Sequence, residues 1–304
     1  MQQTSNIHLA GTIQAELSGC RVDQALAQLF PEYSRERLKS WLLAGHCQVN
    51  GNILRPKDKV AGGEQVVINA AVENAIEWQA EDLPLEIIYA DEDLIVINKP
   101  VGMVVHPAAG NRAGTLVNAL LNYAPELSQV PRAGVVHRLD KDTSGLLVIA
   151  RNLTAHTSLV EQLQARTISR IYETVVHGIF LAGSTINQPI GRHLHDRKKM
   201  AVVRDGKPAI THYRVLTRFP KHTHLQVQLE PGRTHQIRVH MAFVKHPIVG
   251  DRVYAGRIQH NFPRQALHAR RLSLVHPRTG EEMTWEAALP TDMQQLLRDL
   301  TVSV

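Results

Sequence analysis

The chain has 304 residues, of which 43% are hydrophobic and 5% aromatic, with two cysteines and a formal net charge of +6 at pH 7. This length is enough for one large and one small domain, and the positive charge favours an anionic partner. The sequence shows no apolar run near the roughly 18 residues of a membrane helix, no secretory signal, and too few cysteines for a zinc site or a disulfide framework. We therefore expect a cytoplasmic protein that does not bind a membrane.

The first part of the chain predicts a small separate module. The stretches RVDQALAQLF (21–30) and YSRERLKSWLLAGH (33–46) each place apolar residues on one helical face, and CQVNG and EQVVINA predict short strands. Three basic residues crowd the second helix, namely Arg35, Arg37 and Lys39. Taken alone, these charges are explained by a helix face in water.

The composition divides the chain into four segments. We expect an N-terminal extension over 1–18, the small module over 19–70, an acidic linker over 71–84 and a large domain over 85–304. The stretch from Glu73 to Asp93 holds eight acidic residues and no basic one. A polyanion would repel this stretch, so we expect it to stay away from such a partner.

A basic stretch lies within the large domain. From Arg192 to Lys221 there are nine Lys or Arg residues against two Asp. A solvated face rarely segregates charge this far, so we interpret the stretch as a surface for a polyanion, with nucleic acid as the candidate. The segment HLHD (193–196) has metal-binding residue types, but the surrounding cations would repel a metal ion, and we expect no metal site.

Beyond residue 84 the sequence alternates strands and helices, with Gly and Pro between them. The segment LEIIYADEDLIVINKP (85–100) predicts two strands around an Asp-Glu-Asp turn, and AGTLVNALLNY (113–123) predicts a helix. Further strands are expected over 134–150, 169–180, 209–240 and 266–289, and helices over 153–165 and 291–300. This order indicates an α+β domain built on a large, mainly antiparallel sheet.

The strand expected over 134–150 contains a cluster of charge. In GVVHRLDKDTSGLLVIARN (134–152) five ionisable residues interrupt an apolar run. A polar turn in water is the ordinary explanation, and we assign Asp142 to such a turn. The apolar flanks nevertheless place Asp140 at the edge of a core, and on a strand Arg138 would share its face. A carboxylate beside a cation at a strand end is a candidate catalytic group.

The same segment resembles a known family. HRLDKDTSGLLV is similar to the signature of the pseudouridine synthases that modify large-subunit ribosomal RNA and transfer RNA. The module over 19–70 resembles the S4 RNA-binding domain, so the resemblance covers nearly the whole chain. The other family motifs appear in order as INKPVGMVVHP (97–107), SRIYETVVHG (169–178), PGRTHQIRVHM (231–241), HPIVGDRVYAG (246–256) and QALHARRLSLVHP (265–277).

The resemblance implies an α+β pseudouridine synthase fold with a large mixed sheet, and an enzyme that isomerises uridine without a cofactor. By motif position Asp140 is the catalytic carboxylate, Tyr172 stacks on the target base and assists proton transfer, and Arg238 pairs with Asp140. The target uridine would be flipped out of its stack to reach them. The residues expected to contact RNA are His137, Arg138 and Arg233, then Arg35, Arg37 and Lys39 of the module, and Arg192, Lys198 and Lys199 of the basic stretch.

The implied partner is ribosomal RNA of the large subunit, alone or within assembling or assembled subunits, and we expect the chain to act as a monomer. Two other functions stay open from the residues. A non-catalytic RNA-binding or ribosome-assembly factor of the same fold would not need Asp140, Tyr172 and Arg238 together. A glycan-cleaving enzyme that used Asp140 and Asp142 would need aromatic sugar platforms, and only 5% of the chain is aromatic.

Overall fold

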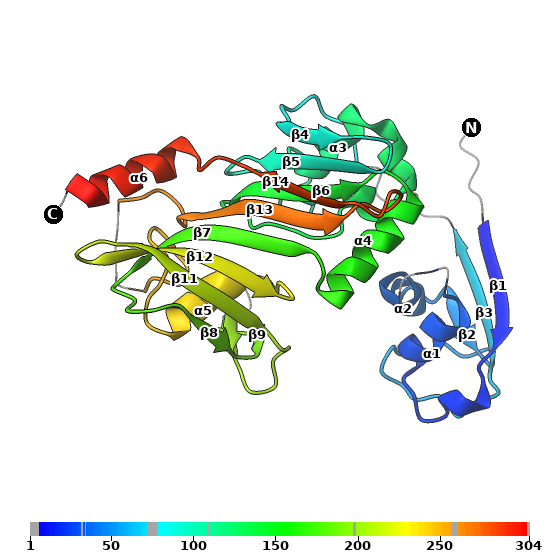
Figure 1. Cartoon of the computed structure of the whole chain (residues 1–304). Coiled ribbons are helices and arrows are strands. Elements are labelled where there is room, and N and C mark those ends of the chain that lie inside the picture. The colour runs from blue at the N-terminus through cyan, green and yellow to red at the C-terminus, as the bar shows by residue number, and fades with distance from the viewer. Residues whose placement is uncertain are drawn as a thin grey trace. The chain divides into compact units, whose positions relative to one another are not determined.

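The structure is a computed structural model, and it describes residues 6–31, 33, 35–71, 78–108, 110–196, 199–256 and 261–302. The chain forms two compact units, Met1–Glu77 and Trp78–Val304 (Figure 1). The division falls inside the acidic segment 71–84 that we expect to be a linker. Within the ranges described, no helix has the length and apolar character needed to cross a membrane.

The first unit is a three-stranded antiparallel sheet packed against two helices. Its elements are β1 (Asn6–Thr12), the 3-10 helix η1 (Ala15–Leu17), α1 (Val22–Leu29), α2 (Arg35–Leu43), β2 (Cys47–Val49) and β3 (Gln65–Ala71). Leu26 of α1, Leu38 of α2 and Ile68 of β3 are fully buried in its own core. The edge strand β1 pairs with β3 and lies within the expected extension 1–18, so this unit begins earlier than residue 19.

The second unit holds a nine-stranded mixed sheet in the order β4-β5-β6-β13-β7-β12-β11-β8, with β14 also paired to β13. The β6–β13 pair is parallel and the other pairs are antiparallel, which confirms the expected α+β class with a mainly antiparallel sheet. The strands are β4 (Ile87–Ala90), β5 (Leu94–Lys99), β6 (Ser144–Ala150), β7 (Ser169–His177), β8 (Ser184–Asn187), β9 (Ile190–Arg192), β10 (Met200–Val202), β11 (Ile210–Arg218), β12 (His222–Glu230), β13 (Leu267–Val275) and β14 (Glu282–Glu286). The helices are α3 (Leu116–Tyr123), η2 (Pro125–Gln129), η3 (Pro131–Gly134), α4 (Leu153–Ala165), α5 (Gln236–Phe243) and α6 (Thr291–Val302). Strands β9 and β10 form a separate two-stranded hairpin.

The strands β5 and β6 are buried on both faces, which explains their unbroken apolar sequences. Ile97 and Leu147 belong to the same buried cluster as the side chains of α3. Their neighbours Val96 and Val148 point to the opposite face and pack in a cluster with α4. The strand that follows the loop of Asp140 is therefore fixed from both sides.

We expected one strand over the segment 134–150, but the structure does not have it. Only its last part forms β6, and residues 135–143 form a loop that folds back so that Val135 makes a β-bridge with Ile149. Gly134 permits this close approach, because its φ is +75° and an added Cβ would lie 1.9 Å from a backbone oxygen of β6. Val135 and Ile149, which flank the charged cluster in sequence, are thus neighbours in space because the chain turns back between them.

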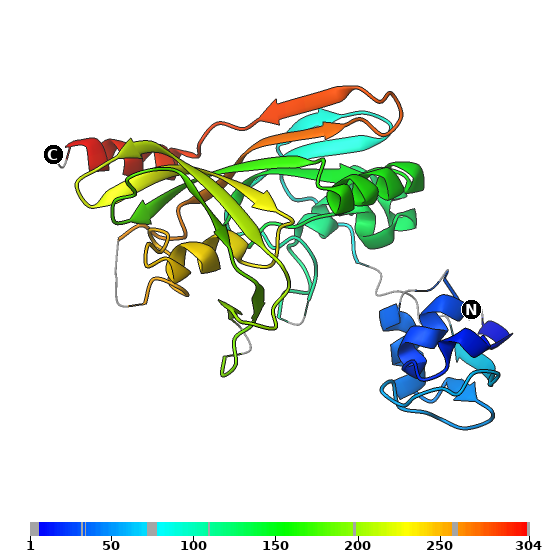
Figure 2. The ribbon, with the colours of Figure 1, turned by 60° about the horizontal axis from the view of Figure 1, so that its bottom comes forward.

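The segment 209–240 also differs from the expected strands. Strands β11 and β12 form a hairpin, but Gln236–Phe243 is helix α5, which lies against the sheet beneath β11 (Figure 2). The residues from Gln236 to Met241 are all buried, so this helix has no polar face to mark a 3.6-residue period. The alternation of Ile237, Val239 and Met241 is instead typical of a strand.

Candidate active site

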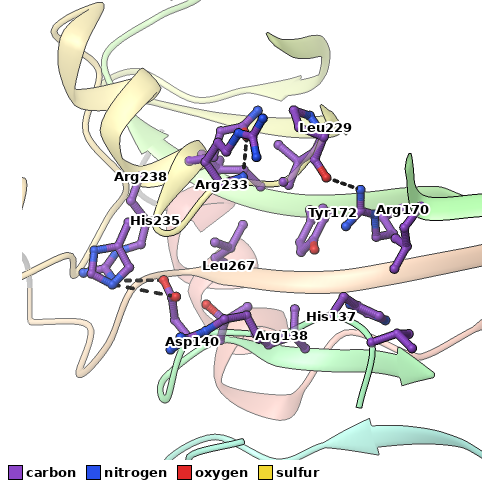
Figure 3. A pocket seen from close by; sticks show the side chains of 18 of the residues that line it. His137, Arg138, Asp140, Arg170, Tyr172, Leu229, Arg233, His235, Arg238 and Leu267 are labelled. Carbon is purple, nitrogen blue, oxygen red and sulfur yellow. Dashed lines mark hydrogen bonds and ion pairs between the residues drawn. The ribbon is translucent and has the colours of Figure 1, made fainter. Parts of the chain in front are cut away.

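A cavity of about 570 Å³ lies in the second unit, where segments far apart in the sequence meet. Its wall comes from the loop 135–143, α4, β7, the turn before α5, and α5 itself (Figure 3). The three residues expected to be catalytic, Asp140, Tyr172 and Arg238, all line this cavity. The side chain of Asp142 does not, so the cavity offers no Asp140–Asp142 pair for glycan cleavage.

Asp140 is held by an ion pair with a buried arginine. Arg238 Nη1 donates to Asp140 Oδ2 at 3.0 Å, while its Nε and Nη2 donate to Asp251 at 2.7 and 3.0 Å. Burial alone would lower the pKa of Arg238, but the carboxylates of Asp251 and Asp140 raise it above its ordinary value, so the guanidinium stays charged. Asp251 also accepts the backbone N–H groups of Val253 and Tyr254. These bonds set the plane of the guanidinium.

The loop that carries Asp140 is held by two buried cations. Lys99 Nζ donates to the carbonyl oxygen of Lys141 at 3.1 Å and to two carbonyls of the turn after β5. Burial lowers the pKa of Lys99 to about 8, so the ammonium is still the larger form at neutral pH. Arg264 Nη1 donates to the carbonyl oxygen of Asp142 at 3.2 Å, and its other nitrogens bind a carboxylate of α6. The loop therefore owes its shape to bonds made through its backbone.

Tyr172 lies on β7 with its ring in the wall of the cavity. The residue is 5% exposed, and burial raises the pKa of its phenol, so the hydroxyl stays protonated at neutral pH. On the same face of β7, Arg170 donates to the carbonyl oxygen of Pro231. Gly232 leaves room for this arginine, since an added Cβ would lie 2.9 Å from Arg170 Nη1. One strand thus supplies both an aromatic ring and a cation to the cavity.

His137 lines the cavity, but its ring is committed to the sheet. Its Nε2 accepts the backbone N–H of Val148 at 3.2 Å, which leaves Nδ1 as the protonated nitrogen of a neutral ring. Burial, reinforced by the charge of Arg170, lowers the pKa of His137 to about 3. This histidine therefore caps an open backbone donor of β6, and its contact with RNA stays a prediction.

Besides Arg238, five further arginines line the cavity, among them Arg132, Arg138 and Arg233. Arg138 and Arg132 form no ion pair with any carboxylate in the part of the chain that the structure describes, and both are exposed. Burial of its guanidinium and the charge of Arg138 lower the pKa of Arg132. Arg233 Nε donates to the carbonyl oxygen of Pro208 at 3.1 Å. The expectation that Arg138 shares a strand face with Asp140 is wrong, because both residues lie in the loop.

The basic residues of the first unit already make contacts within it. Arg35 Nη2 lies 2.8 Å from Asp23 Oδ2, and the Asp23 side chain is only 3% exposed. The Arg37 guanidinium stacks over Trp41, with 5.3 Å from its carbon to the ring centroid. Lys39 is half-buried on α2. Any RNA contact by Arg35 would have to be made alongside its ion pair.

Two of the expected RNA-binding residues of the basic stretch, Arg192 and Lys199, lie at the β9–β10 hairpin. Arg192 is exposed at the end of β9. Lys199 Nζ lies 3.7 Å from Asp196 Oδ2, an exposed pair that contributes little to stability. Lys198 lies outside the described residues. Arg192 and Lys199 are therefore on, or next to, an element separate from the main sheet.

Three side chains around Asp140 carry no role in the sequence analysis. His235 Nε2 lies 3.7 Å from Asp140 Oδ1. Asp251 binds Arg238, and Arg170 lies beside Tyr172 on β7. All three fall within the family motifs quoted above, and that resemblance is the only signal that could have located them. Residue type and spacing alone do not distinguish them from ordinary polar residues.

One group of side chains has the composition of a metal site. Ligand atoms of Asp91, Asp93 and His276 lie within 4.8 Å of one another. The Tyr89 hydroxyl donates to Asp91 at 2.5 Å, and Arg278 Nε lies 2.8 Å from Asp93. Because these partners already occupy the carboxylate oxygens, we interpret the group as a polar contact that joins the β4–β5 turn to the segment after β13.

Comparisons with known proteins identify relatives of the chain. A profile described as RNA pseudouridylate synthase matches residues 93–243, and the S4 domain profile matches residues 20–66. The chain is 55% identical to a protein of Pseudomonas aeruginosa named ribosomal large subunit pseudouridine synthase D, over 96% of this chain and 95% of the relative. It is 52% identical to the protein of the same name from Escherichia coli K12, over 96% of this chain and 94% of the relative.

Solved structures of two human proteins share the fold. Human RNA pseudouridylate synthase domain containing 4 has a TM-score of 0.58 and 25% identity, over 71% of this chain and 93% of its own. Human RNA pseudouridylate synthase domain containing 1 has a TM-score of 0.55 and 24% identity, over 73% of this chain and 96% of its own.

Arg238→Met should destabilise the protein in addition to changing the site. The substitution leaves Asp251, whose side chain is fully buried, without its cation, which should lower the free energy of unfolding by about 3–5 kcal/mol. Adding Asp251→Asn should restore part of this loss, and Arg233→Met should cost only about 1 kcal/mol. Urea unfolding followed by circular dichroism measures all three. An Arg238→Met protein as stable as the original would contradict the structural importance of the Arg238–Asp251 pair.

Proposed function

Because the chain belongs to the RNA pseudouridine synthase family, we propose that it converts specific uridines of large-subunit (23S) ribosomal RNA to pseudouridine, with no cofactor. The observation that carries this proposal is the convergence of Asp140, Tyr172 and Arg238 on one cavity, with Asp140 bound to Arg238 at 3.0 Å. The names of the two bacterial relatives support the large subunit as the source of the RNA. A protein that only binds RNA would gain nothing from a buried ion pair aimed into a cavity.

The reaction breaks the bond between N1 of uracil and C1′ of ribose and forms a bond between C5 and C1′. The proton on C5 must leave, and N1 must gain one, so no net proton is consumed. A carboxylate can act on such a carbon as a nucleophile or by stabilising positive charge. We assign this role to Asp140, because Arg238 binds one of its oxygens and the other lies at the cavity wall.

Tyr172 is placed to hold the detached base and to move the C5 proton. Its ring offers a flat apolar surface for stacking, and its hydroxyl is protonated at neutral pH because burial raises the phenol pKa. The hydroxyl would therefore act as a relay that receives the proton from C5 and passes its own proton to N1 of the same base, which must gain one. The charge of Arg170 lowers the pKa of Tyr172 and that of Asp140 raises it, but burial has the larger effect.

The arginines around the cavity suit the backbone of a flipped nucleotide. Arg132 and Arg138 have no carboxylate partner among the described residues, and Arg233 binds only a backbone carbonyl there. A flipped uridine brings its own phosphates to the rim of the pocket that receives the base. We assign Arg138 and Arg233 to these phosphates, and the basic residues of the first unit and of the β9–β10 hairpin to positioning contacts farther along the RNA.

The setting of the reaction follows from its substrate. Large-subunit RNA is available free, in assembling subunits and in assembled subunits, and we propose that the enzyme acts as a monomer in the cytoplasm at one of these stages. Mapping pseudouridine in ribosomal RNA by carbodiimide treatment and primer extension, in cells with and without the gene, tests the substrate. Loss of no large-subunit pseudouridine on deletion would refute this substrate.

Asp140→Asn should abolish pseudouridine formation while RNA affinity changes by less than about threefold, since the amide keeps the size of the side chain but not its charge. The measurement is tritium release from C5-labelled uridine in a ribosomal RNA fragment, with affinity for the same fragment by filter binding. Asp142→Asn is the matched control and should keep its activity, because its side chain does not line the cavity. Parallel loss of affinity and activity in Asp140→Asn would assign Asp140 a structural role.

Substitutions of Tyr172 separate stacking from proton transfer. Stacking on a base contributes roughly 1–3 kcal/mol and needs only the ring, so Tyr172→Leu should weaken RNA binding. Tyr172→Phe keeps the ring but not the hydroxyl, and we expect it to bind normally and stall in single-turnover assays. If the Phe protein turns over at the normal rate, the hydroxyl moves no proton and only stacking is left to Tyr172.

Removal of the first unit should weaken RNA binding without unfolding the second. The second unit has a separate core, so a chain that begins at Trp78 should keep a cooperative thermal transition. Its affinity should fall, and the slope of log K against log salt should become flatter, because fewer phosphates are neutralised. Titrations at several salt concentrations measure this. An unchanged slope would mean that the first unit makes no phosphate contact.

A further inference from the structure

The second oxygen of Asp140 faces a histidine that has no assigned role. Arg238 binds Oδ2, and His235 Nε2 lies 3.7 Å from Oδ1, so a nitrogen faces each oxygen of the carboxylate (Figure 3). A distance of 3.7 Å is too long for a formed hydrogen bond. Catalytic hydrogen bonds in enzymes without substrate are often long and shorten in the complex.

The contact between Tyr254 and His235 Nδ1 indicates which nitrogen of His235 carries the proton. The Tyr254 hydroxyl accepts the backbone N–H of Met200 at 2.9 Å, and its oxygen lies 2.8 Å from His235 Nδ1. Burial raises the pKa of Tyr254, so this hydroxyl keeps its proton. The oxygen could accept a second bond from Nδ1–H, but the hydroxyl proton would then have no acceptor among the described contacts, so donation to Nδ1 is the arrangement that satisfies both groups. The neutral ring then carries its own proton on Nε2, the nitrogen that faces Asp140.

The opposite tautomer is disfavoured by the surroundings of the ring. With the proton on Nδ1, the lone pair of Nε2 would face the carboxylate of Asp140. Burial lowers the pKa of His235, and the charges of Arg238 and Arg138 lower it further, whereas Asp140 and Asp251 raise it. The ring is therefore neutral at neutral pH, with an N–H dipole that points at the catalytic carboxylate.

The backbone at His235 is held in an uncommon conformation. Its φ of 57° and ψ of 21° lie in the left-handed region, at the residue that precedes α5. Such a conformation is strained for a non-glycine residue and is often retained at functional sites. The next turn of the same helix carries Arg238, so one short segment presents both nitrogen groups to Asp140.

We propose that His235 is a positioning residue of the pseudouridine synthase reaction, and that its Nε2–H orients Asp140 Oδ1 while Tyr254 fixes the tautomer. This inference rests on the function proposed above and adds a second contact to the ion pair with Arg238. When Arg238 binds Oδ2 and His235 binds Oδ1, the carboxylate of Asp140 has a fixed orientation toward C1′. The link through Met200 also ties this orientation to the first residue of β10, which pairs with Arg192 in the β9–β10 hairpin.

Single-turnover rates of His235 variants test the proposal. His235→Ala removes the donor and should slow pseudouridine formation by about 10- to 100-fold, with RNA affinity within about twofold of the original. His235→Gln restores an N–H at similar reach and should recover most of the rate. Tyr254→Phe should lose less than His235→Ala, because the N–H survives in part of the population. His156→Gln, on α4 and outside the cavity lining, is the matched control and should behave as the original.

The outcomes separate this inference from the proposed function. Normal turnover by His235→Ala would overturn the inference alone, and so would equal slowing in a folded His235→Gln protein. Nitrogen NMR of histidine-labelled protein gives a readout that needs no activity, with the His235 signals assigned by their absence in His235→Gln. A neutral ring protonated on Nε2 supports the proposal, and one protonated on Nδ1 overturns it. Absence of pseudouridine formation by the unsubstituted protein would instead count against the proposed function.

Discussion

The guanidinium of Arg238 is the point on which the site depends, because it joins three parts of the chain that are distant in sequence. Its planar fork places two donors on Asp251 and one on Asp140. The two contacts differ in setting: the Asp251 side chain is fully buried, whereas that of Asp140 is 16% exposed at the cavity. The buried contact therefore fixes the arginine, and the arginine in turn fixes a carboxylate that substrate can reach.

Around the loop of Asp140, too, the side chains that hold the structure are different from the side chain that would react. Lys99 and Arg264 bind carbonyl oxygens of Lys141 and Asp142, the two residues after Asp140. Cations that bind backbone carbonyls fix the course of the loop without occupying its carboxylate side chains. The side chain of Asp140 is left to face Arg238 and His235, both at the start of α5, and the cavity that a substrate would enter.

Sequence reasoning succeeded where a physical pattern was present and failed where burial erased it. The apolar strands β5 and β6 and the helices α3 and α4 follow from periodicity and punctuation. Helix α5 does not, because it is buried all round and alternates like a strand, and yet it carries Arg238. The sequence predicts the loop 135–143 as part of a strand, because the bridge between Val135 and Ile149 joins residues that no local pattern relates. The family resemblance located Asp140, but not its neighbour His235, whose importance depends on a distance.

The interaction partners of the basic residues indicate their roles better than the number of basic residues does. Arg35, like Arg238, is paired with a buried carboxylate and serves the fold. Arg132 and Arg138 line the cavity with no carboxylate among the residues described, and the lowered pKa of Arg132 reflects burial of its guanidinium together with its repulsion from Arg138. Two cations held close together are stabilised when an anion comes between them, and an RNA phosphate is such an anion. The net charge of +6 does not distinguish these cases, so the search for RNA contacts should begin with the arginines that the protein leaves without a carboxylate.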